Sequence, residues 1–459
     1  MLGRVLRRIK RKFIKAAPRF ELGIKDLQSS ALPLGHAAEN DINIPTFDLN
    51  SKQQNCLLII SNGHGEDVIA LEIIKKLLKY KKYNMIEVLP LVGDGYHFDS
   101  LIDKRFKKIG YLRVLPSGGF SNQSFKGFLL DLHSGMLIDL FKNWLIIRRK
   151  SRKTYKLLAI GDLLPLFFAW SSKCQFAFMG TPKSDYTWSS GPGWSITDFY
   201  HKLKGSEWDP WELMLMKANR CQIVIMRDEI TAINLKKKNI NAKYFGNPMM
   251  DFVLHKQIPI KSNFNSQKII LLIGSRYPES INNLNNFLSS LSSFNHTKKL
   301  IFLVPLTINL NVKEIKQILI RYNFNEDKKE NFLIGEESIW RKKNNFLLIG
   351  RNTFNKWANL ADIGLSNAGT ATEQIAGLGI PSLSMPGKGP QFTKSFAKRQ
   401  ERLLGGSVIV CKDTISLIKR LNILLNDEKI RKSQAHLGTE RMGSKGASQK
   451  IVDYLNRKL

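Results

Sequence analysis

Cysteine, acidic residues and long apolar runs are all scarce in this chain of 459 residues. The four cysteines, Cys56, Cys174, Cys221 and Cys411, are far apart and never form a Cys-x-x-Cys pair. This spacing argues against a disulfide framework and indicates buried thiols in a reducing compartment. No uncharged apolar run reaches the roughly 18 residues that a membrane-spanning helix needs. We therefore expect a protein that is soluble or peripheral to a membrane.

Acidic residues are too few to balance the basic ones. The chain has 71 lysines and arginines against 38 aspartates and glutamates, a formal net charge of +33. Part of the excess lies among asparagines in segments such as 239–243, 328–331 and 342–345, which is typical of AT-rich coding sequence. No zinc-ligand spacing or RNA-recognition signature accompanies the charge, so we do not expect a nucleic acid partner. An anionic membrane surface or a phosphate-bearing substrate explains the charge better.

The length and the apolar content predict two domains. Apolar residues make up 43% of the chain, too many for a disordered polypeptide. The chain is longer than the size at which a single core stops growing, and strands alternate with helices in both halves. The expected parts are a basic N-terminal extension (1–51), a first α/β domain (52–251), a polar linker (252–267), a second α/β domain (268–430) and a C-terminal helix (431–459).

A turn of small residues between a strand and a helix dominates the stretch from Asp362 to Gln391. Residues 361–365 predict a buried strand, and Gly379 with Pro381 ends the helix that follows. Free backbone N–H groups at such a helix start suit a phosphate or pyrophosphate, although small residues also make tight turns without a ligand. The residues expected around a phosphorylated ligand are Asn367, Gly369, Thr370, Ala371 and Thr372.

Polar side chains and a second loop complete this expected pocket. Glu373 and Gln374 follow within half a turn, where either can bind sugar hydroxyls, and Gln391 closes the pocket after the next strand. Residues 268–273 predict another buried strand that leads into a small loop at a helix start. An arginine there can bind a phosphate with two parallel hydrogen bonds. The residues of this second loop are Gly274, Ser275 and Arg276.

The first half opens on a strand, a glycine-rich loop and a helix, as an open parallel sheet does. Residues 56–60 are fully apolar, and His64 lies between two glycines where such a sheet binds its ligand. This imidazole is either a base or anion ligand, or a turn residue without a role. Asp162 ends the strand 155–160, where it either serves as a general base or caps the next helix. Residues 180–201 predict a surface loop over the crevice.

Two basic, apolar segments indicate contact with lipid. Residues 1–20 place apolar side chains at helical spacing among lysines and arginines, as either a membrane-bound amphipathic helix or a disordered leader would. Residues 120–150 are helical, rich in apolar and aromatic residues, and basic at their end. They form either a helix inserted among lipid headgroups or an ordinary core helix.

Several of these motifs together resemble lipid-A-disaccharide synthase over residues 52–430. They are Gly274-Ser-Arg, Gly246-Asn-Pro-x-x-Asp251, and Gly369-Thr-Ala-Thr followed by an acid or amide. The Ser-Asn-Ala-Gly that begins at Ser366 is similar to the GlcNAc transferase of lipid II synthesis. The Gly-His-Gly loop is similar to that enzyme and to monogalactosyldiacylglycerol synthase. The first loop departs from the Gly-Glu-x-Ser-Gly-Asp of lipid-A-disaccharide synthase, and the family's Asp-x-Pro-Asp-Phe-Asn becomes Ile-Gly-Asp-Leu-Leu-Pro here.

The resemblance implies a GT-B fold, in which two Rossmann-like α/β domains with parallel sheets carry C-terminal helices. It also implies an inverting, metal-independent hexosyltransferase that uses a UDP-sugar as substrate, needs no cofactor and works on a lipid-linked acceptor. The enzyme would be peripheral on the cytoplasmic face of the membrane. Asp162 is the nearest match to the family's catalytic acid, with His64 as the other candidate base. The family's ribose-binding glutamate falls on Gln374 by spacing, with Glu373 beside it.

Two other functions fit the same architecture. A sugar-nucleotide epimerase has no need of an apolar acceptor face such as residues 120–150. A basic protein that binds membranes without catalysis would have no reason to keep so many small residues in the two phosphate loops.

Overall fold

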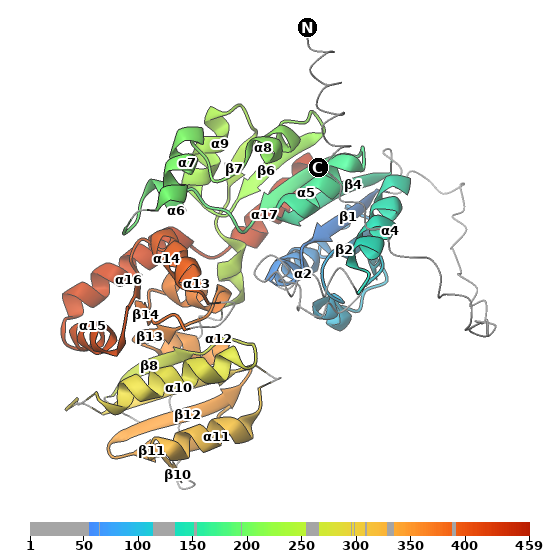
Figure 1. Ribbon diagram of the computed structural model, residues 1–459. Coiled ribbons are helices and arrows are strands. Elements are labelled where there is room, and N and C mark those ends of the chain that lie inside the picture. Colours follow the sequence, from blue (N-terminus) through green and yellow to red (C-terminus); the bar gives the residue numbers. More distant parts are fainter. Residues whose placement is uncertain are drawn as a thin grey trace, which may run out of the picture. The chain divides into compact units, whose positions relative to one another are not determined.

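The structure is a computed structural model, and its described residues all belong to the unit Lys52–Leu459 (Figure 1). The described ranges are 55–63, 65–112, 134–150, 154–193, 195–253, 266–294, 296–297, 299–307, 310–327, 335–387 and 392–459. The predicted features that lie outside them are residues 1–20, His64, Gln391, residues 254–265 of the linker and the first part of the segment 120–150. Among the described helices, none is both long and apolar enough to cross a bilayer.

The first domain is built on a sheet of seven parallel strands in the order β3-β2-β1-β4-β5-β6-β7. The central strands are apolar on both faces, which suits a parallel sheet covered by helices on both sides. The strands are β1 (Cys56–Ser61), β2 (Met85–Pro90), β3 (Phe106–Lys108), β4 (Tyr155–Gly161), β5 (Gln175–Gly180), β6 (Cys221–Met226) and β7 (Ala242–Tyr244).

Helices cover both faces of this sheet. One face packs against α2 (Gly65–Leu77) and the C-terminal helix α17 (Ala447–Lys458). The other packs against α4 (Met136–Arg149), α5 (Leu163–Ser171), α8 (Pro210–Met216) and α9 (Glu229–Lys237). Shorter elements in this domain are η1 (Tyr96–Ser100), α6 (Tyr186–Ser189), α7 (Ile196–Lys204) and η3 (Pro248–Phe252).

The second domain holds an eight-stranded sheet in the order β10-β11-β12-β9-β8-β13-β14-β15. Its strands pair in parallel except where β11 meets β10 and β12. Both domains are therefore α/β units built on parallel sheets, which confirms the predicted fold class. The strands are β8 (Gln267–Leu272), β9 (Leu300–Leu306), β10 (Asn325–Asp327), β11 (Ser338–Lys342), β12 (Asn345–Arg351), β13 (Ile363–Ser366), β14 (Ser382–Ser384) and β15 (Val408–Val410).

The helices of the second domain also lie on both faces of its sheet. One face packs against α10 (Glu279–Ser292), α11 (Val312–Arg321) and α15 (Thr414–Asn426). The other packs against α12 (Phe354–Trp357), η4 (Ala358–Leu360) and α13 (Thr370–Gly377). The remaining helices are α14 (Lys394–Leu403) and α16 (Glu428–Met442), and α16 contacts α13.

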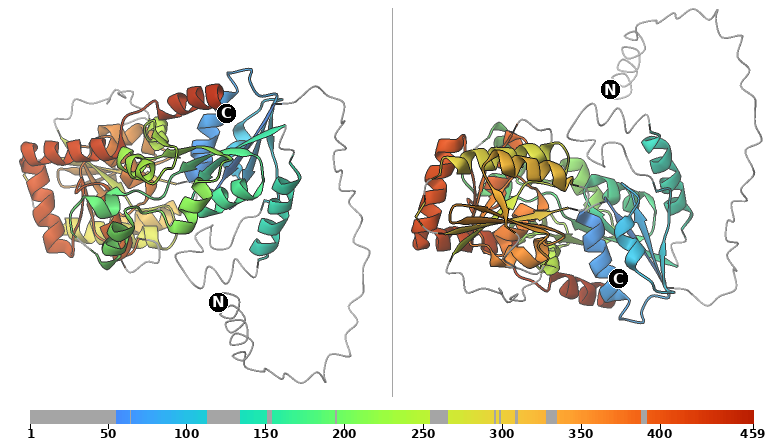
Figure 2. Two further views of the ribbon diagram at one scale, coloured as in Figure 1. Left: turned by 90° about the horizontal axis from the view of Figure 1, so that it is seen from above. Right: turned by 90° about the horizontal axis from the view of Figure 1, so that it is seen from below.

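The end of the chain returns to the first domain, where α17 lies beside α2 (Figure 2). Ile451, Val452 and Leu455 of α17 are fully buried there. The Asp251 carboxylate accepts hydrogen bonds from the backbone N–H groups of Gly446 and Ser448, both at 2.6 Å. The Gly-Asn-Pro-x-x-Asp motif therefore fixes the start of the returning helix.

One predicted loop is wrong in part. Residues 180–201 include the short helix α6 and most of α7. The Asp198 carboxylate accepts the backbone N–H of Ser195 at 2.7 Å, which stabilises the start of α7. The glycines and proline just before Ser195 hid this helix signal in the sequence. The predicted helix within residues 120–150 is present as α4, which covers the part that the structure describes.

Candidate functional site

The glycine-rich loop that leads into α2 and the small-residue turn that starts α13 face each other at the carboxyl ends of β1 and β13. A Cβ atom placed on Gly65, at the start of α2, would lie 4.0 Å from the Thr370 hydroxyl at the start of α13. In open parallel sheets, ligands bind at this edge. The glycine-rich loop of the first domain and the small-residue turn of the second therefore lie next to each other, and the junction between them is called the crevice below.

The start of α13 has the geometry of a phosphate site. Gly369 occupies the N-cap position, and no side chain caps the helix. The backbone N–H groups of Thr372 and Glu373 bond to the Gly369 carbonyl at 3.1 and 3.3 Å, which closes the first turn of the helix around Thr370 and Ala371. Thr370 is exposed. A diphosphate at this position would meet backbone donors and the positive end of the helix dipole.

Two of the predicted ligand residues are turned into the protein. The buried Thr372 hydroxyl donates to the Ala368 carbonyl and shares a hydrogen bond with Ser366, both at 2.5 Å. The Asn367 side chain donates to the Met385 carbonyl at 2.8 Å and accepts the Met385 N–H at 3.0 Å. These two side chains hold the turn in shape.

The loop of Gly274, Ser275 and Arg276 lies beside the turn that starts α13. Gly274 has a φ of +89°, a left-handed conformation that favours glycine, and a Cβ there would lie 3.4 Å from the Asn367 carbonyl oxygen. Ser275 is exposed and Arg276 is half-buried. Burial lowers the pKa of Arg276 to about 10, while nearby Glu279 opposes this shift, so the guanidinium stays charged at neutral pH. The Gly274 loop with its Arg276 cation and the turn of α13 therefore lie together on the second domain.

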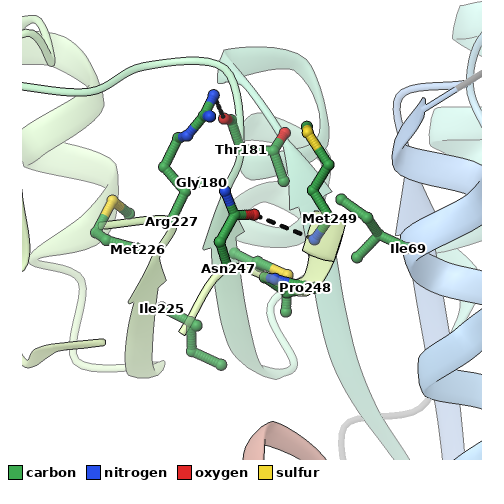
Figure 3. Close-up of a pocket in the computed structure, with 10 residues that line it drawn as sticks. Ile69, Gly180, Thr181, Ile225, Met226, Arg227, Asn247, Pro248 and Met249 are labelled. Carbon is green, nitrogen blue, oxygen red and sulfur yellow. Dashed lines mark hydrogen bonds between the residues drawn. The ribbon is translucent and has the colours of Figure 1, made fainter. Parts of the chain in front are cut away.

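Both predicted ribose ligands contact residues of the first domain. The Glu373 carboxylate pairs with Arg227 at 2.6 Å, and both of these side chains are largely buried, with 13% and 7% exposed. The Gln374 amide donates to the Met249 carbonyl at 3.2 Å and points toward η3. Arg227 also donates to the Thr181 carbonyl at 3.1 Å (Figure 3).

A small cavity lies beside Arg227 at the carboxyl ends of β5 and β6 (Figure 3). Its volume of about 10 Å³ is too small for a sugar or a nucleotide. Asn247 lines it and accepts the Met249 N–H at 3.1 Å, so the motif that carried part of the resemblance also shapes this corner. The candidate ligand site is therefore the open crevice rather than this cavity.

Asp162 occupies the start of α5 and is half-buried. Its carboxylate accepts the Leu164 N–H at 3.0 Å, which is the helix-capping contact that the sequence left open as an alternative to catalysis. A cap does not prevent a second role, because a carboxylate has two oxygens and several acceptor positions.

Glu66 is a further acid in the crevice that the sequence analysis did not select. It directly follows Gly65, and its carboxylate accepts a hydrogen bond from the Thr181 hydroxyl at 2.8 Å. Burial raises the pKa of Glu66, Asp162 adds to the rise, and Thr181 and Arg227 oppose it. Its position two residues after His64 was the signal available in the sequence.

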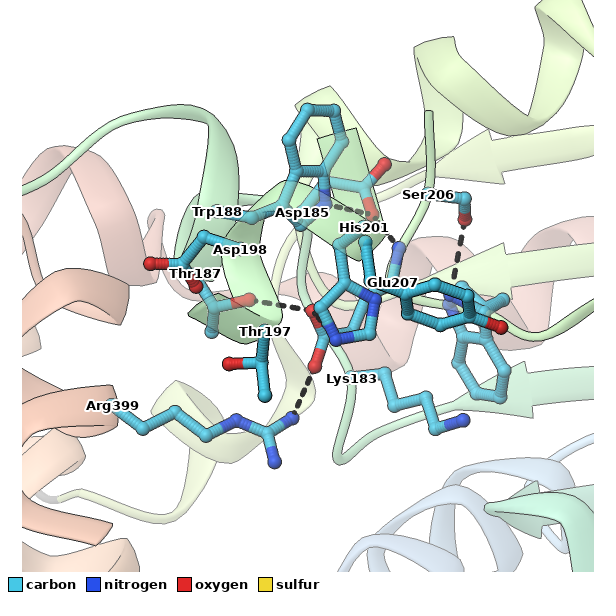
Figure 4. A network of polar contacts seen from close by, with 12 residues as sticks. Lys183, Asp185, Thr187, Trp188, Thr197, Asp198, His201, Ser206, Glu207 and Arg399 are labelled. Atoms are coloured by element: carbon cyan, nitrogen blue, oxygen red, sulfur yellow. Dashed lines mark hydrogen bonds and ion pairs between the residues drawn. The ribbon is translucent and has the colours of Figure 1, made fainter. Parts of the chain in front are cut away.

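A polar network joins residues 183–209 of the first domain to α14 of the second (Figure 4). Buried Glu207 accepts the Thr187 hydroxyl at 2.8 Å and pairs with Arg399 of α14 at 2.7 Å. Arg402 of α14 lies 3.5 Å from Asp198. These contacts connect the two domains through charged groups. Among the described residues, no cluster of His, Cys, Asp and Glu could hold a metal ion.

No protein-family model matches this chain, and no curated protein matches its sequence. Solved structures do match its fold. UDP-GlcNAc 2-epimerase from Neisseria meningitidis, solved with UDP-GlcNAc, has a TM-score of 0.50 and 16% identity, over 88% of this chain and 100% of that one. MurG from Acinetobacter baumannii has a TM-score of 0.51 and 14% identity, over 88% and 100%. The glycosyltransferase of kitacinnamycin has a TM-score of 0.51 and 12% identity, over 89% and 100%.

Identities this low establish the fold alone. The matches span nearly the whole of each compared chain, so the two-domain GT-B architecture predicted from the sequence is confirmed. The narrower resemblance to lipid-A-disaccharide synthase stays a prediction.

Proposed function

We propose that this protein transfers a sugar from a UDP-sugar to a lipid-linked acceptor at a membrane surface. The observation that carries the proposal is the uncapped start of α13, which faces the Gly65 loop across the crevice. A helix start without a side-chain cap, placed at the ligand edge of a parallel sheet, suits a diphosphate. The fold neighbour from Neisseria meningitidis, solved with UDP-GlcNAc, supports the choice of a UDP-sugar.

The donor would lie on the second domain. Its diphosphate would bind the backbone at Thr370 and Ala371, next to the charged Arg276. Glu373 and Gln374 both stay proposed ligands of the ribose hydroxyls, since Glu373 pairs with Arg227 and the Gln374 amide is engaged with Met249. Gln391 stays a proposed ligand beyond the described residues. Transfer would invert the anomeric centre and need no metal or cofactor. The base would be Asp162, His64 or another carboxylate near them.

The acceptor would approach from the first domain. Leu137, Ile138 and Phe141 of α4 are each about 60% exposed. The exposed charged residues of the same helix are all cations: Lys142, Arg148 and Arg149. An exposed apolar face with exposed cations on the same helix suits an anionic lipid surface. We therefore propose a peripheral enzyme on the cytoplasmic face of the membrane.

The helix α5 provides a path from this surface to the crevice. It starts at Asp162, it contacts α4, and its Leu163 and Phe167 are 38% and 42% exposed. A lipid-linked acceptor lying along α5 would bring its hydroxyl to the acids at the start of that helix.

A UDP-sugar epimerase is the second candidate, favoured by the fold match to UDP-GlcNAc 2-epimerase. It would use the same donor loops without any acceptor. Incubation with a UDP-sugar alone separates the two candidates, because only an epimerase converts the sugar, and NMR of the product reports it.

Calorimetric titration with UDP, GDP, ADP and their sugars tests the donor site. We expect UDP compounds to bind and Thr370→Asp to reduce their affinity at least 100-fold, because it places a carboxylate against the phosphates. Thr197→Asp, at an exposed position on α7, is the matched control and should leave affinity unchanged. UDP binding that survives in Thr370→Asp would remove this site from the proposal.

A further inference from the structure

We propose that Glu66 accepts the proton of the acceptor hydroxyl during sugar transfer. This role rests on the proposed function and deepens it. The sequence resemblance directs attention to Asp162, whereas the geometry of the crevice favours the acid in the glycine-rich loop.

Glu66 lies where the two domains meet. It directly follows Gly65, the residue whose Cβ would lie 4.0 Å from Thr370. It also stands in the first turn of α2, on the first domain and opposite the helix start proposed to bind the diphosphate.

A chain of contacts crosses the crevice from Glu66. Glu66 accepts the Thr181 hydroxyl at 2.8 Å, and the Thr181 carbonyl accepts from Arg227 at 3.1 Å. Arg227 in turn pairs with Glu373 at 2.6 Å. Glu66 is therefore linked to the helix proposed to bind the donor, and the Thr181 hydroxyl orients its carboxylate.

Glu66 and Asp162 differ in their contacts. An Asp162 oxygen caps the backbone of α5 through Leu164, so that oxygen is engaged in holding the helix start. Burial raises the pKa of Glu66, with Asp162 contributing, which makes the Glu66 carboxylate a stronger proton acceptor than an exposed glutamate. Asp162 then serves to position α5 and to raise the pKa of Glu66 further.

The acceptor oxygen forms a bond to the anomeric carbon of the donor sugar, and its proton passes to the Glu66 carboxylate. The bond between that carbon and the β-phosphate oxygen breaks, and UDP leaves with the electron pair. Positive backbone dipoles at the start of α13 stabilise the charge that develops on the leaving diphosphate.

The test needs no acceptor, because a diphosphate placed close to Glu66 must raise its pKa, so that part of the population binds a proton while the rest stays anionic as the base. UDP-glucose, UDP-galactose and UDP-GlcNAc are titrated calorimetrically into the full chain at pH 6 to 8, in buffers of different ionisation enthalpy. Wild type should take up a fraction of a proton on binding. Glu66→Gln, which keeps an acceptor for Thr181, should lose most of that uptake with less than about a threefold change in affinity, and the neighbouring Asp67, whose pKa is about 7, accounts for the remainder.

Matched variants make the outcome decisive. Asp162→Asn should retain proton uptake, and Glu66→Asp should retain part of it. Hydrolysis of the bound UDP-sugar, in which water replaces the acceptor hydroxyl and UDP is released, should be about 100-fold or more slower in Glu66→Gln. Unchanged uptake in Glu66→Gln, or its loss in Asp162→Asn, would overturn the assignment while leaving the donor site intact. Failure of wild type to bind any UDP-sugar would instead overturn the proposed function.

Discussion

The ion pair between Arg227 and Glu373 links the two domains with both side chains largely buried. Arg227→Met should lower the free energy of unfolding by about 3–5 kcal/mol, because it leaves the Glu373 carboxylate buried without its cation. Arg351→Met is the matched control. That residue pairs with Glu337 at 3.6 Å while 39% exposed, so its loss should cost at most about 1 kcal/mol. Urea unfolding measures both, and equal losses would contradict the prediction.

The buried Asp67 should make stability depend on pH. Burial raises the pKa of its carboxyl to about 7 from an ordinary 3.8, against the hydrogen bond that the Ser61 hydroxyl donates at 2.5 Å. A folded-state pKa above the unfolded value means that this group's contribution to stability is complete below about pH 4. The contribution is then lost as the pH rises through 7.

Asp67→Asn should remove this dependence. Relative to wild type, its free energy of unfolding should therefore improve steadily between pH 4 and pH 7 and level off above pH 8. Urea unfolding across that range measures the difference. Asp453→Asn is the control: hydrogen bonds from Tyr80 and Gln449 lower the pKa of Asp453, so its effect should change only at more acidic pH. A flat difference for Asp67→Asn would contradict the burial argument.

At the scale of elements, α4 decides the membrane prediction. Ile138→Glu with Phe141→Glu should reduce co-sedimentation with anionic vesicles, because both side chains are exposed on its apolar face. The matched control is Ile320→Glu with Ile415→Glu, which alters two exposed isoleucines of the second domain. If both double variants and wild type co-sediment equally with the vesicles at low salt, a docking role for α4 is refuted.

Salt separates the two parts of this binding. Each lysine or arginine near an anionic surface contributes about 1 kcal/mol and is screened by salt, whereas inserted apolar side chains are not. Wild type should therefore keep part of its vesicle binding at high salt, and the α4 variant should lose that part. Deletion of residues 1–20 should reduce mainly the salt-sensitive part.

At the scale of the whole molecule, the return of α17 joins the end of the chain to the first domain. Deletion of residues 447–459 removes Ile451, Val452 and Leu455, each fully buried and worth about 1.5–3 kcal/mol. The first domain should lose several kcal/mol of stability, while UDP binding by the second domain should persist more weakly. Asp251→Asn, which disturbs only the cap of α17, should cost about 1–2 kcal/mol. Thermal unfolding followed with and without UDP measures both effects.

The architecture and the position of the candidate loops follow from local sequence patterns. Apolar strands such as 56–60 and 221–226 alternate with helical patterns, and this alternation specifies parallel sheets because both strand faces must be covered. Small residues at 369–372 and 274–275 marked the helix starts and tight turns that lie at the crevice. Such signals are local, since a strand, a cap or a turn depends on neighbours within a few positions.

Only the tertiary structure decided which side chains meet. Arg227 and Glu373 are 146 positions apart, and Glu66 and Thr181 are 115 apart, so no local pattern connects them. The sequence left Glu373 and Gln374 as equal candidates for the ribose, and the packing of α13 turned Gln374 toward Met249. Residues adjacent on a helix point in directions about 100° apart. Which of them faces a ligand therefore depends on how the whole helix is docked.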